Sequence, residues 1–121
     1  MSDQPLILAV DHNRRNLELL TQFLEREDYR ARGATSLEEL DQVLDGTEEI
    51  ALALLDLAGF DRSIWERCER LRKAEIPFLV ISPQQSAAVQ QESLAHGARS
   101  VLVKPLAVKE LLGLIRNLLG E

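Results

Sequence analysis

Short apolar runs alternate along this chain with longer segments in which apolar residues recur every three or four positions. The runs are LILAV, ALALL, FLVI and VLV, and the residues that follow them are Asp11, Asp56, Ser82 and Lys104. Such alternation is typical of βαβ units, in which parallel strands form one sheet that helices cover on both faces. With a weaker run at residues 30–34, the pattern predicts an α/β fold: a doubly wound, five-stranded parallel sheet with five helices.

The expected elements follow from apolar spacing and from the residues that begin and end helices. We expect strands at residues 6–10, 30–34, 50–55, 77–82 and 101–103. Helices are expected over residues 13–27, between Ser36 and Gly46, around residues 64–71, over residues 86–96 and after Pro105. Ser36 with Glu39 forms a capping-box signature, and Gly46 and Gly97 are typical of positions that follow a helix.

Three aromatic or reactive side chains are interpreted as structural. Trp65 and Cys68 lie on the helix face that should pack against the sheet, so we expect both in the hydrophobic core. His96 precedes Gly97 at an expected helix end, where an imidazole suits the negative end of the helix dipole. Cys68 is the only cysteine, so the chain can form no intramolecular disulfide.

The length and the charge of the chain limit what it can be. Its 121 residues suit one domain over residues 1–121, and the net charge of -6 disfavours direct nucleic-acid binding, which needs clustered Lys and Arg. The first residues do not resemble a signal peptide, and no apolar stretch approaches the roughly 20 residues that cross a bilayer. We therefore expect a cytoplasmic protein with neither nucleic acid nor membrane as a direct partner.

The polar residues that follow the apolar runs should meet in space. Parallel strands end at the same edge of their sheet, and open α/β sheets bind ligands at that edge. We therefore expect one crevice to contain the carboxylates of Asp11 and Asp56, the hydroxyl of Ser82 and the ammonium of Lys104.

The same residues lie in motifs that resemble the receiver domains of two-component response regulators. The motifs are AVDHNRRNLELL after the first strand, LLDL at the third, ISP at the fourth and HGARSVLVKPL around the fifth. They occur in the family's order, and the resemblance covers the whole chain. It implies a single receiver domain over residues 1–121 with a flavodoxin-like fold.

The resemblance also implies a role for three residues of the expected crevice. Asp56 matches the carboxylate that accepts a phosphoryl group. Lys104 matches the ammonium that offsets charge on the phosphoryl oxygens, and Ser82 matches the hydroxyl that binds one of those oxygens and draws its loop inward as a switch.

A metal site is implied beside the acceptor, with one departure from the family. Asp11 and His12 match an adjacent acidic pair that holds Mg²⁺, and Asp56 with the carbonyl of Ala58 matches the rest of the metal ligands. His12 replaces the second acid of the pair. Because Mg²⁺ prefers oxygen ligands, an imidazole there removes both a charge and a suitable donor, so we expect weak Mg²⁺ binding.

Two further departures concern the switch and the loop after the acceptor. Val101 occupies a position that is usually aromatic in the family, so switching through an aromatic rotamer is unavailable. Phe60 and Ile64 stand where proline and glycine are common, which makes the loop bulkier.

Three functions remain open from the sequence. The leading one is a receiver that is phosphorylated on Asp56 by a histidine kinase or phosphotransfer protein; it is not an enzyme beyond its own phosphorylation. It would signal through its fourth helix, fifth strand and fifth helix, to an output domain or a homodimer. An alternative, motivated by His12, Val101 and the altered loop after Asp56, is a degenerate pseudo-receiver that works as a phosphorylation-independent interaction module. A flavodoxin-like cofactor binder would need a Ser-, Thr- or Gly-rich phosphate loop, and DHNRRN is not one.

Overall fold

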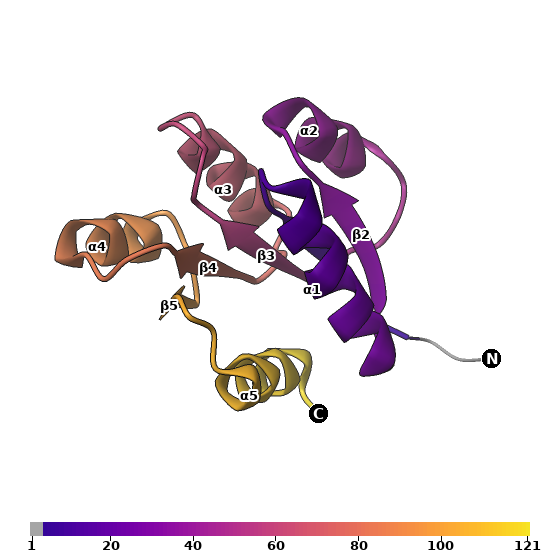
Figure 1. The fold of residues 1–121 in the computed structure, drawn as a ribbon. Coiled ribbons are helices and arrows are strands. Elements are labelled where there is room, and N and C mark those ends of the chain that lie inside the picture. Colours follow the sequence, from indigo (N-terminus) through magenta and orange to yellow (C-terminus); the bar gives the residue numbers. More distant parts are fainter. Residues whose placement is uncertain (1–3) are drawn as a thin grey trace.

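The computed structural model of this protein describes residues 4–121 and contains one parallel sheet of five strands in the order β2-β1-β3-β4-β5 (Figure 1). The strands are β1 (Leu6–Val10), β2 (Arg30–Ala34), β3 (Leu52–Asp56), β4 (Phe78–Ser82) and β5 (Ser100–Val103). Each pairs in parallel with its neighbours, so all five carboxyl ends lie at one edge. The predicted doubly wound five-stranded sheet is confirmed.

Five helices connect the strands in alternation. They are α1 (Arg14–Arg26), α2 (Leu37–Asp45), α3 (Ile64–Lys73), α4 (Ala87–Ala95) and α5 (Val108–Leu119). The Ser36 hydroxyl accepts the Glu39 N–H at 3.1 Å, as the capping signature predicted. Glu39 in turn accepts the N–H of Thr35 at 2.6 Å, one residue before the cap. Gly97 follows α4 with a φ of 106°, a left-handed conformation that glycine adopts without strain.

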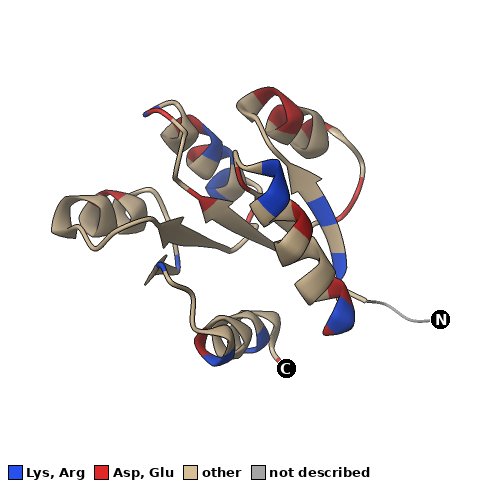
Figure 2. Ribbon diagram, in the orientation of Figure 1, with Lys and Arg blue, Asp and Glu red and all other residues tan. Residues whose placement is uncertain are grey.

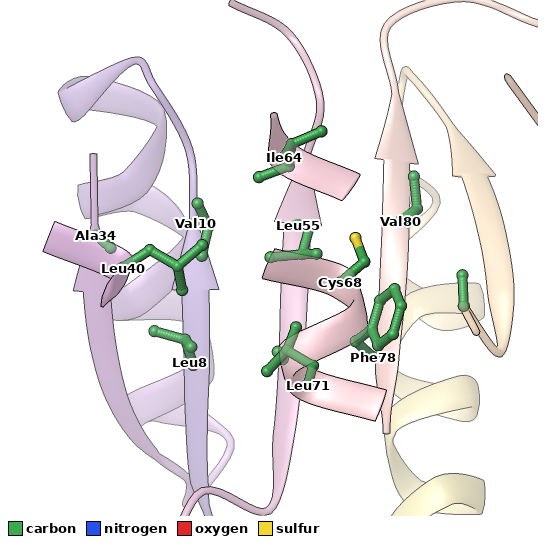
Figure 3. Packing of buried hydrophobic residues seen from close by; sticks show 12 residues of the cluster. Leu8, Val10, Ala34, Leu40, Leu55, Ile64, Cys68, Leu71, Phe78 and Val80 are labelled. Carbon is green, nitrogen blue, oxygen red and sulfur yellow. The ribbon is translucent and has the colours of Figure 1, made fainter. Parts of the chain in front are cut away.

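The helices cover the sheet on both faces, because successive strand residues point to opposite sides. Along β3, Leu52 and Leu54 pack with α1 and α5, whereas Leu55 points the other way, toward α3. Figure 3 shows the second face, where side chains of α2 and α3 meet the strands. Its labelled members are Leu8, Val10, Ala34, Leu40, Leu55, Ile64, Cys68, Leu71, Phe78 and Val80.

Cys68 and Trp65 differ in depth although both belong to α3. Cys68 is fully buried, as predicted, and burial raises the pKa of its thiol to about 12, which keeps the thiol protonated and unreactive at neutral pH. Trp65 is only half-buried, so the expectation of a core position is met in part: its ring packs on the edge of the core and stacks on His96.

Among the described residues, no helix has the length and apolar character that spanning a membrane requires.

Candidate functional site at the carboxyl edge of the sheet

Four adjacent strands deliver the predicted polar residues to one edge of the sheet. Asp11 directly follows β1, Asp56 ends β3, Ser82 ends β4, and Lys104 directly follows β5. The ladder continues past β5, because the N–H of Lys104 donates to the carbonyl of Ser82 at 3.0 Å. The side chains of Asp11, Asp56 and Ser82 are buried, which is unusual for polar groups and requires partners for each.

Asp56 has a defined partner on each carboxylate oxygen. Its Oδ2 lies 2.5 Å from the Nζ of Lys104, and its Oδ1 accepts the N–H of Ala58 at 3.0 Å. Lys104 keeps about a third of its side chain exposed, whereas Asp56 is only 3% exposed. The ammonium therefore reaches down from the rim of the site to a carboxylate at its floor.

Asp11 is the second carboxylate of the site. Its Oδ1 accepts the N–H of Asn13 at 2.9 Å, which fixes the turn into α1. Burial raises the pKa of Asp11 above its ordinary value of 3.8, and the neighbouring Asp56 carboxylate raises it further. The Asn13 N–H and the Lys104 ammonium act in the opposite direction. A second positive charge in this site would therefore relieve a real repulsion between two buried carboxylates.

Ser82 lies at the expected edge with its hydroxyl turned into its own loop. The Oγ donates to the carbonyl of Gln84 at 2.6 Å, and the side chain is buried. The hydroxyl is thus already satisfied by the β4–α4 loop. To bind an oxygen of a phosphoryl group on Asp56, the hydroxyl would have to break its hydrogen bond with the Gln84 carbonyl.

His12 follows Asp11 in sequence but lies outside the buried cluster. It is exposed, and its ring makes an edge contact with Phe60 at a centroid distance of 5.8 Å. Gly59 lies under this ring with a φ of 85°, and a Cβ at that position would come within 2.9 Å of the His12 ring. The contact between His12 and the loop after Asp56 was not foreseen from the sequence, which gives no periodic signal for loop-to-loop packing.

The donor set suits a hard divalent cation with few protein ligands. Asp11 and Asp56 supply carboxylate oxygens, and Mg²⁺ in phosphoryl-transfer sites commonly uses one or two carboxylates with waters and phosphate oxygens. Within residues 4–121, no three His, Cys, Asp or Glu side chains form a metal-binding cluster. The residues therefore fit Mg²⁺ through two carboxylates rather than three.

A groove of about 670 Å³ opens beside these charged groups, between α1 and the segment from Lys104 into α5. Asp11, Asp56 and Lys104 lie at its polar end. Its walls are mostly apolar and include Leu19, Leu20, Phe23, Leu106, Val108 and Leu111. Leu19 and Val108 are about half exposed, at 47% and 54%. The sequence signal for this groove is that Leu19 and Leu20 are adjacent, so that only one of them can face the core. The other, Leu19, must lie on the surface of α1.

Comparison with known proteins shows the family to which the chain belongs. The family model for the response regulator receiver domain matches residues 7–116. The chain belongs to this family, and residues 7–116 are therefore a receiver domain of the two-component type.

Individual relatives show the same likeness. The chain is 32% identical to the transcriptional regulatory protein GltR of Pseudomonas aeruginosa over 118 residues, which are 93% of this chain and 48% of that protein. It is 26% identical to the heme response regulator HssR of Staphylococcus saprophyticus over 113 residues, 93% of this chain and 50% of that protein. The chain thus spans about half the length of these curated relatives.

Solved structures share the fold along nearly the whole chain. A response regulator receiver protein from Pseudomonas putida superposes with a TM-score of 0.85 at 27% identity, covering 97% of this chain and 99% of that one. A CheY-like receiver domain protein from Methanospirillum hungatei gives the same TM-score and identity, covering 98% and 95%. A response regulator protein from Burkholderia pseudomallei, with a phosphorylated aspartic acid, a calcium ion and citrate, is 25% identical with a TM-score of 0.81, covering 91% and 65%.

Proposed function

We propose that this receiver domain accepts a phosphoryl group on Asp56 from a histidine kinase or phosphotransfer protein and changes its partner contacts as a result. One observation carries the proposal. Asp56 is a buried carboxylate at the carboxyl end of the central strand, held by the Lys104 ammonium on one oxygen and by the Ala58 N–H on the other, with Asp11 beside it. The phosphorylated aspartic acid in the related Burkholderia pseudomallei structure supports the same chemistry.

In the proposed reaction a carboxylate oxygen of Asp56 attacks the phosphorus of a phosphohistidine on the partner. A P–O bond forms while the P–N bond breaks, and the electron pair of that bond returns to the imidazole nitrogen. The products are an acyl phosphate on Asp56 and an unmodified histidine on the donor. Lys104 is already aligned with Asp56, so its charge can offset negative charge on the transferring group without reorganisation.

Asp11 and Asp56 would hold a divalent cation, with the Ala58 carbonyl as a further oxygen ligand. Mg²⁺ supplies positive charge toward the phosphoryl oxygens when it is bound. His12, at the position of the second acid, is exposed against Phe60 and adds no carboxylate to the set. We therefore propose that Mg²⁺ binds, and binds more weakly than a three-carboxylate site would bind it.

Two surfaces suit the proposed partners. The groove between α1 and α5 opens onto Asp56, so an apolar surface of the phosphodonor that fills it would bring a phosphohistidine to the acceptor. Output would pass through α4, β5 and α5, where Leu94 and Val103 are exposed, to an output domain or to a second copy. The relatives that are twice as long support an attached or separate output partner. We place this exchange in the cytoplasm.

Incubation with acetyl phosphate and millimolar Mg²⁺, followed by intact-mass measurement, tests the proposal. We expect one phosphoryl adduct that is absent in Asp56→Asn. A protein that stays unmodified at every Mg²⁺ concentration would contradict phosphorylation and favour the degenerate interaction module.

A further inference from the structure

An ion pair crosses from the loop that follows Asp56 to α4. The guanidinium of Arg62 approaches both carboxylate oxygens of Glu92, at 2.6 and 3.4 Å. Arg62 belongs to the segment between β3 and α3, and Glu92 is the only charged residue within α4. Figure 2 shows α4 as an otherwise uncharged helix. Glu92 is therefore the one charged side chain of α4 that can bind the segment after β3.

A second contact fastens the far end of α4 to α3. The Trp65 ring stacks on the His96 ring with a centroid distance of 5.1 Å and an interplanar angle of 10°. The Nδ1 of His96 lies 3.0 Å from a carboxylate oxygen of Glu69, also on α3, and its Nε2 lies 3.9 Å from Glu92. His96 is thus held between one aromatic ring and two carboxylates. We call Arg62, Glu92, Trp65, His96 and Glu69 the α3–α4 clamp.

The clamp borders the switch hydroxyl. A groove of about 420 Å³ lies between the β3–α3 segment and α4, and its lining includes Arg62, Trp65, Ser82, Gln84 and Glu92. The Ser82–Gln84 hydrogen bond described above therefore lies on the same groove as the Arg62–Glu92 ion pair. Three residues separate Ser82 from Ser86 along the chain, and the Ser86 hydroxyl caps α4 by accepting the N–H of Val89. We therefore expect a shift of the Ser82 loop to move the start of α4.

Relay through an aromatic side chain on β5 is absent in this chain, because Val101 lies there, packed at the edge of the core. The clamp offers a different connection, since it joins the loop after the acceptor directly to α4. The Arg62 side chain is 81% exposed, and Glu92, His96 and Glu69 are partly exposed, so small displacements can break these ion pairs without opening the core.

We propose that the α3–α4 clamp holds α4 in the arrangement in which Ser82 is bonded to Gln84, and that it opposes the shift that would bring the Ser82 hydroxyl to a phosphoryl group on Asp56. This inference rests on the proposed phosphorylation and names its regulation. The clamp stabilises one of two states, so breaking it shifts the population toward the other. By linkage, a phosphoryl analogue on Asp56 binds more tightly when the clamp is broken.

The clamp itself can be tested without any phosphoryl group. Hydrogen exchange of the α4 amides is compared in the wild-type protein, in Arg62→Gln and in Arg62→Gln combined with His96→Gln. An exposed ion pair of this kind changes local opening by about 2- to 5-fold, so we expect α4 exchange to be faster by that factor in Arg62→Gln and by more in the double variant.

Arg32→Gln is the matched control, because Arg32 makes a similar two-pronged ion pair with Glu48 at 2.6 and 2.9 Å, away from α4. It should leave α4 exchange unchanged. Equal α4 exchange in Arg62→Gln and wild type would overturn the clamp. The emission of Trp65, the only tryptophan, gives a second reading, because loss of the stack with His96 changes its surroundings.

Beryllofluoride, an analogue of a phosphoryl group on a carboxylate, tests the coupling. Its affinity is measured by fluorine NMR at saturating Mg²⁺, and we expect it to be about 2- to 5-fold higher in Arg62→Gln than in wild type and Arg32→Gln. Unchanged affinity with faster α4 exchange would overturn the coupling. A wild-type protein that binds no beryllofluoride contradicts both the proposed function and the coupling, while the exchange data still decide whether the clamp exists.

Discussion

The Nζ of Lys104 lies 2.5 Å from the Oδ2 of Asp56, so the residue after β5 neutralises the residue at the end of β3 across the intervening strand β4. The contact does two things in the structure. It compensates a carboxylate whose side chain is only 3% exposed, and it keeps an ammonium beside the carboxylate that we propose as nucleophile.

Replacing Lys104 should therefore cost stability as well as phosphorylation. Lys104→Met leaves Asp11 and Asp56 buried without their cation, and we expect the free energy of unfolding at pH 7 to fall by about 1–3 kcal/mol. Urea unfolding measures it. Asp56→Asn in the Lys104→Met background should recover part of the loss, because it removes one of the two facing charges. If Lys104→Met lowered the free energy of unfolding equally with Asp56 and with Asn at position 56, repulsion between the carboxylates would not be the cause.

The raised pKa of Asp11 has a consequence for stability against pH. A carboxyl whose pKa is higher in the folded than in the unfolded protein stabilises the fold most at pH values below its unfolded-state pKa. This stabilisation is lost as pH rises through the folded-state pKa. Without metal, Asp11→Asn should thus be more stable than wild type at pH 7, with a difference that shrinks toward pH 4. Urea unfolding across this pH range checks it. A constant difference at all pH values would contradict the assignment to Asp11.

Restoring the second acid should strengthen metal binding. In His12→Asp a third carboxylate joins Asp11 and Asp56. At an effective dielectric constant between those of water and a protein surface, its attraction for the cation should raise the Mg²⁺ affinity about tenfold or more. Calorimetric titration measures the change, with His12→Asn as the uncharged control. An aspartate variant that binds Mg²⁺ no better than wild type would show that position 12 does not face the metal.

Gly59 should resist substitution for two separable reasons. Its φ of 85° disfavours any residue with a Cβ, and that Cβ would meet the His12 ring. We expect Gly59→Ala to lose about 1–2 kcal/mol of stability in urea unfolding. His12→Ala in the same chain should restore only the steric part. Full restoration would mean that the backbone conformation carries no cost.

The sheet and its carboxyl edge are predictable from the sequence, because short apolar runs and helical spacing are local patterns. β2 and β1 begin and end as predicted, and β3 begins at Leu52 rather than residue 50 and ends on Asp56 itself. The chain also places Asp11, Asp56 and Lys104 together, since parallel strands share a carboxyl edge.

The contacts that sequence patterns do not predict are those between loops and between helices. Three contacts depend on loop conformation and on the relative placement of helices: the edge contact of His12 with Phe60, the stack of Trp65 on His96 and the hydrogen bond from the Ser82 hydroxyl to Gln84. Neither loop conformation nor helix placement is encoded in local periodicity. His96 was expected to be structural at a helix end, and the structure adds its partners on α3.

The most direct measurement locates the phosphoryl group. After treatment with acetyl phosphate and Mg²⁺, borohydride reduces an acyl phosphate to the alcohol, so a phosphorylated aspartate becomes homoserine while phosphoserine and phosphohistidine do not. Tandem mass spectrometry of the peptide that contains residues 52–56 then reads the modified position. We predict homoserine at position 56, dependent on both acetyl phosphate and Mg²⁺. Reduction at another carboxylate, or at none, would contradict Asp56 as the phosphoryl acceptor.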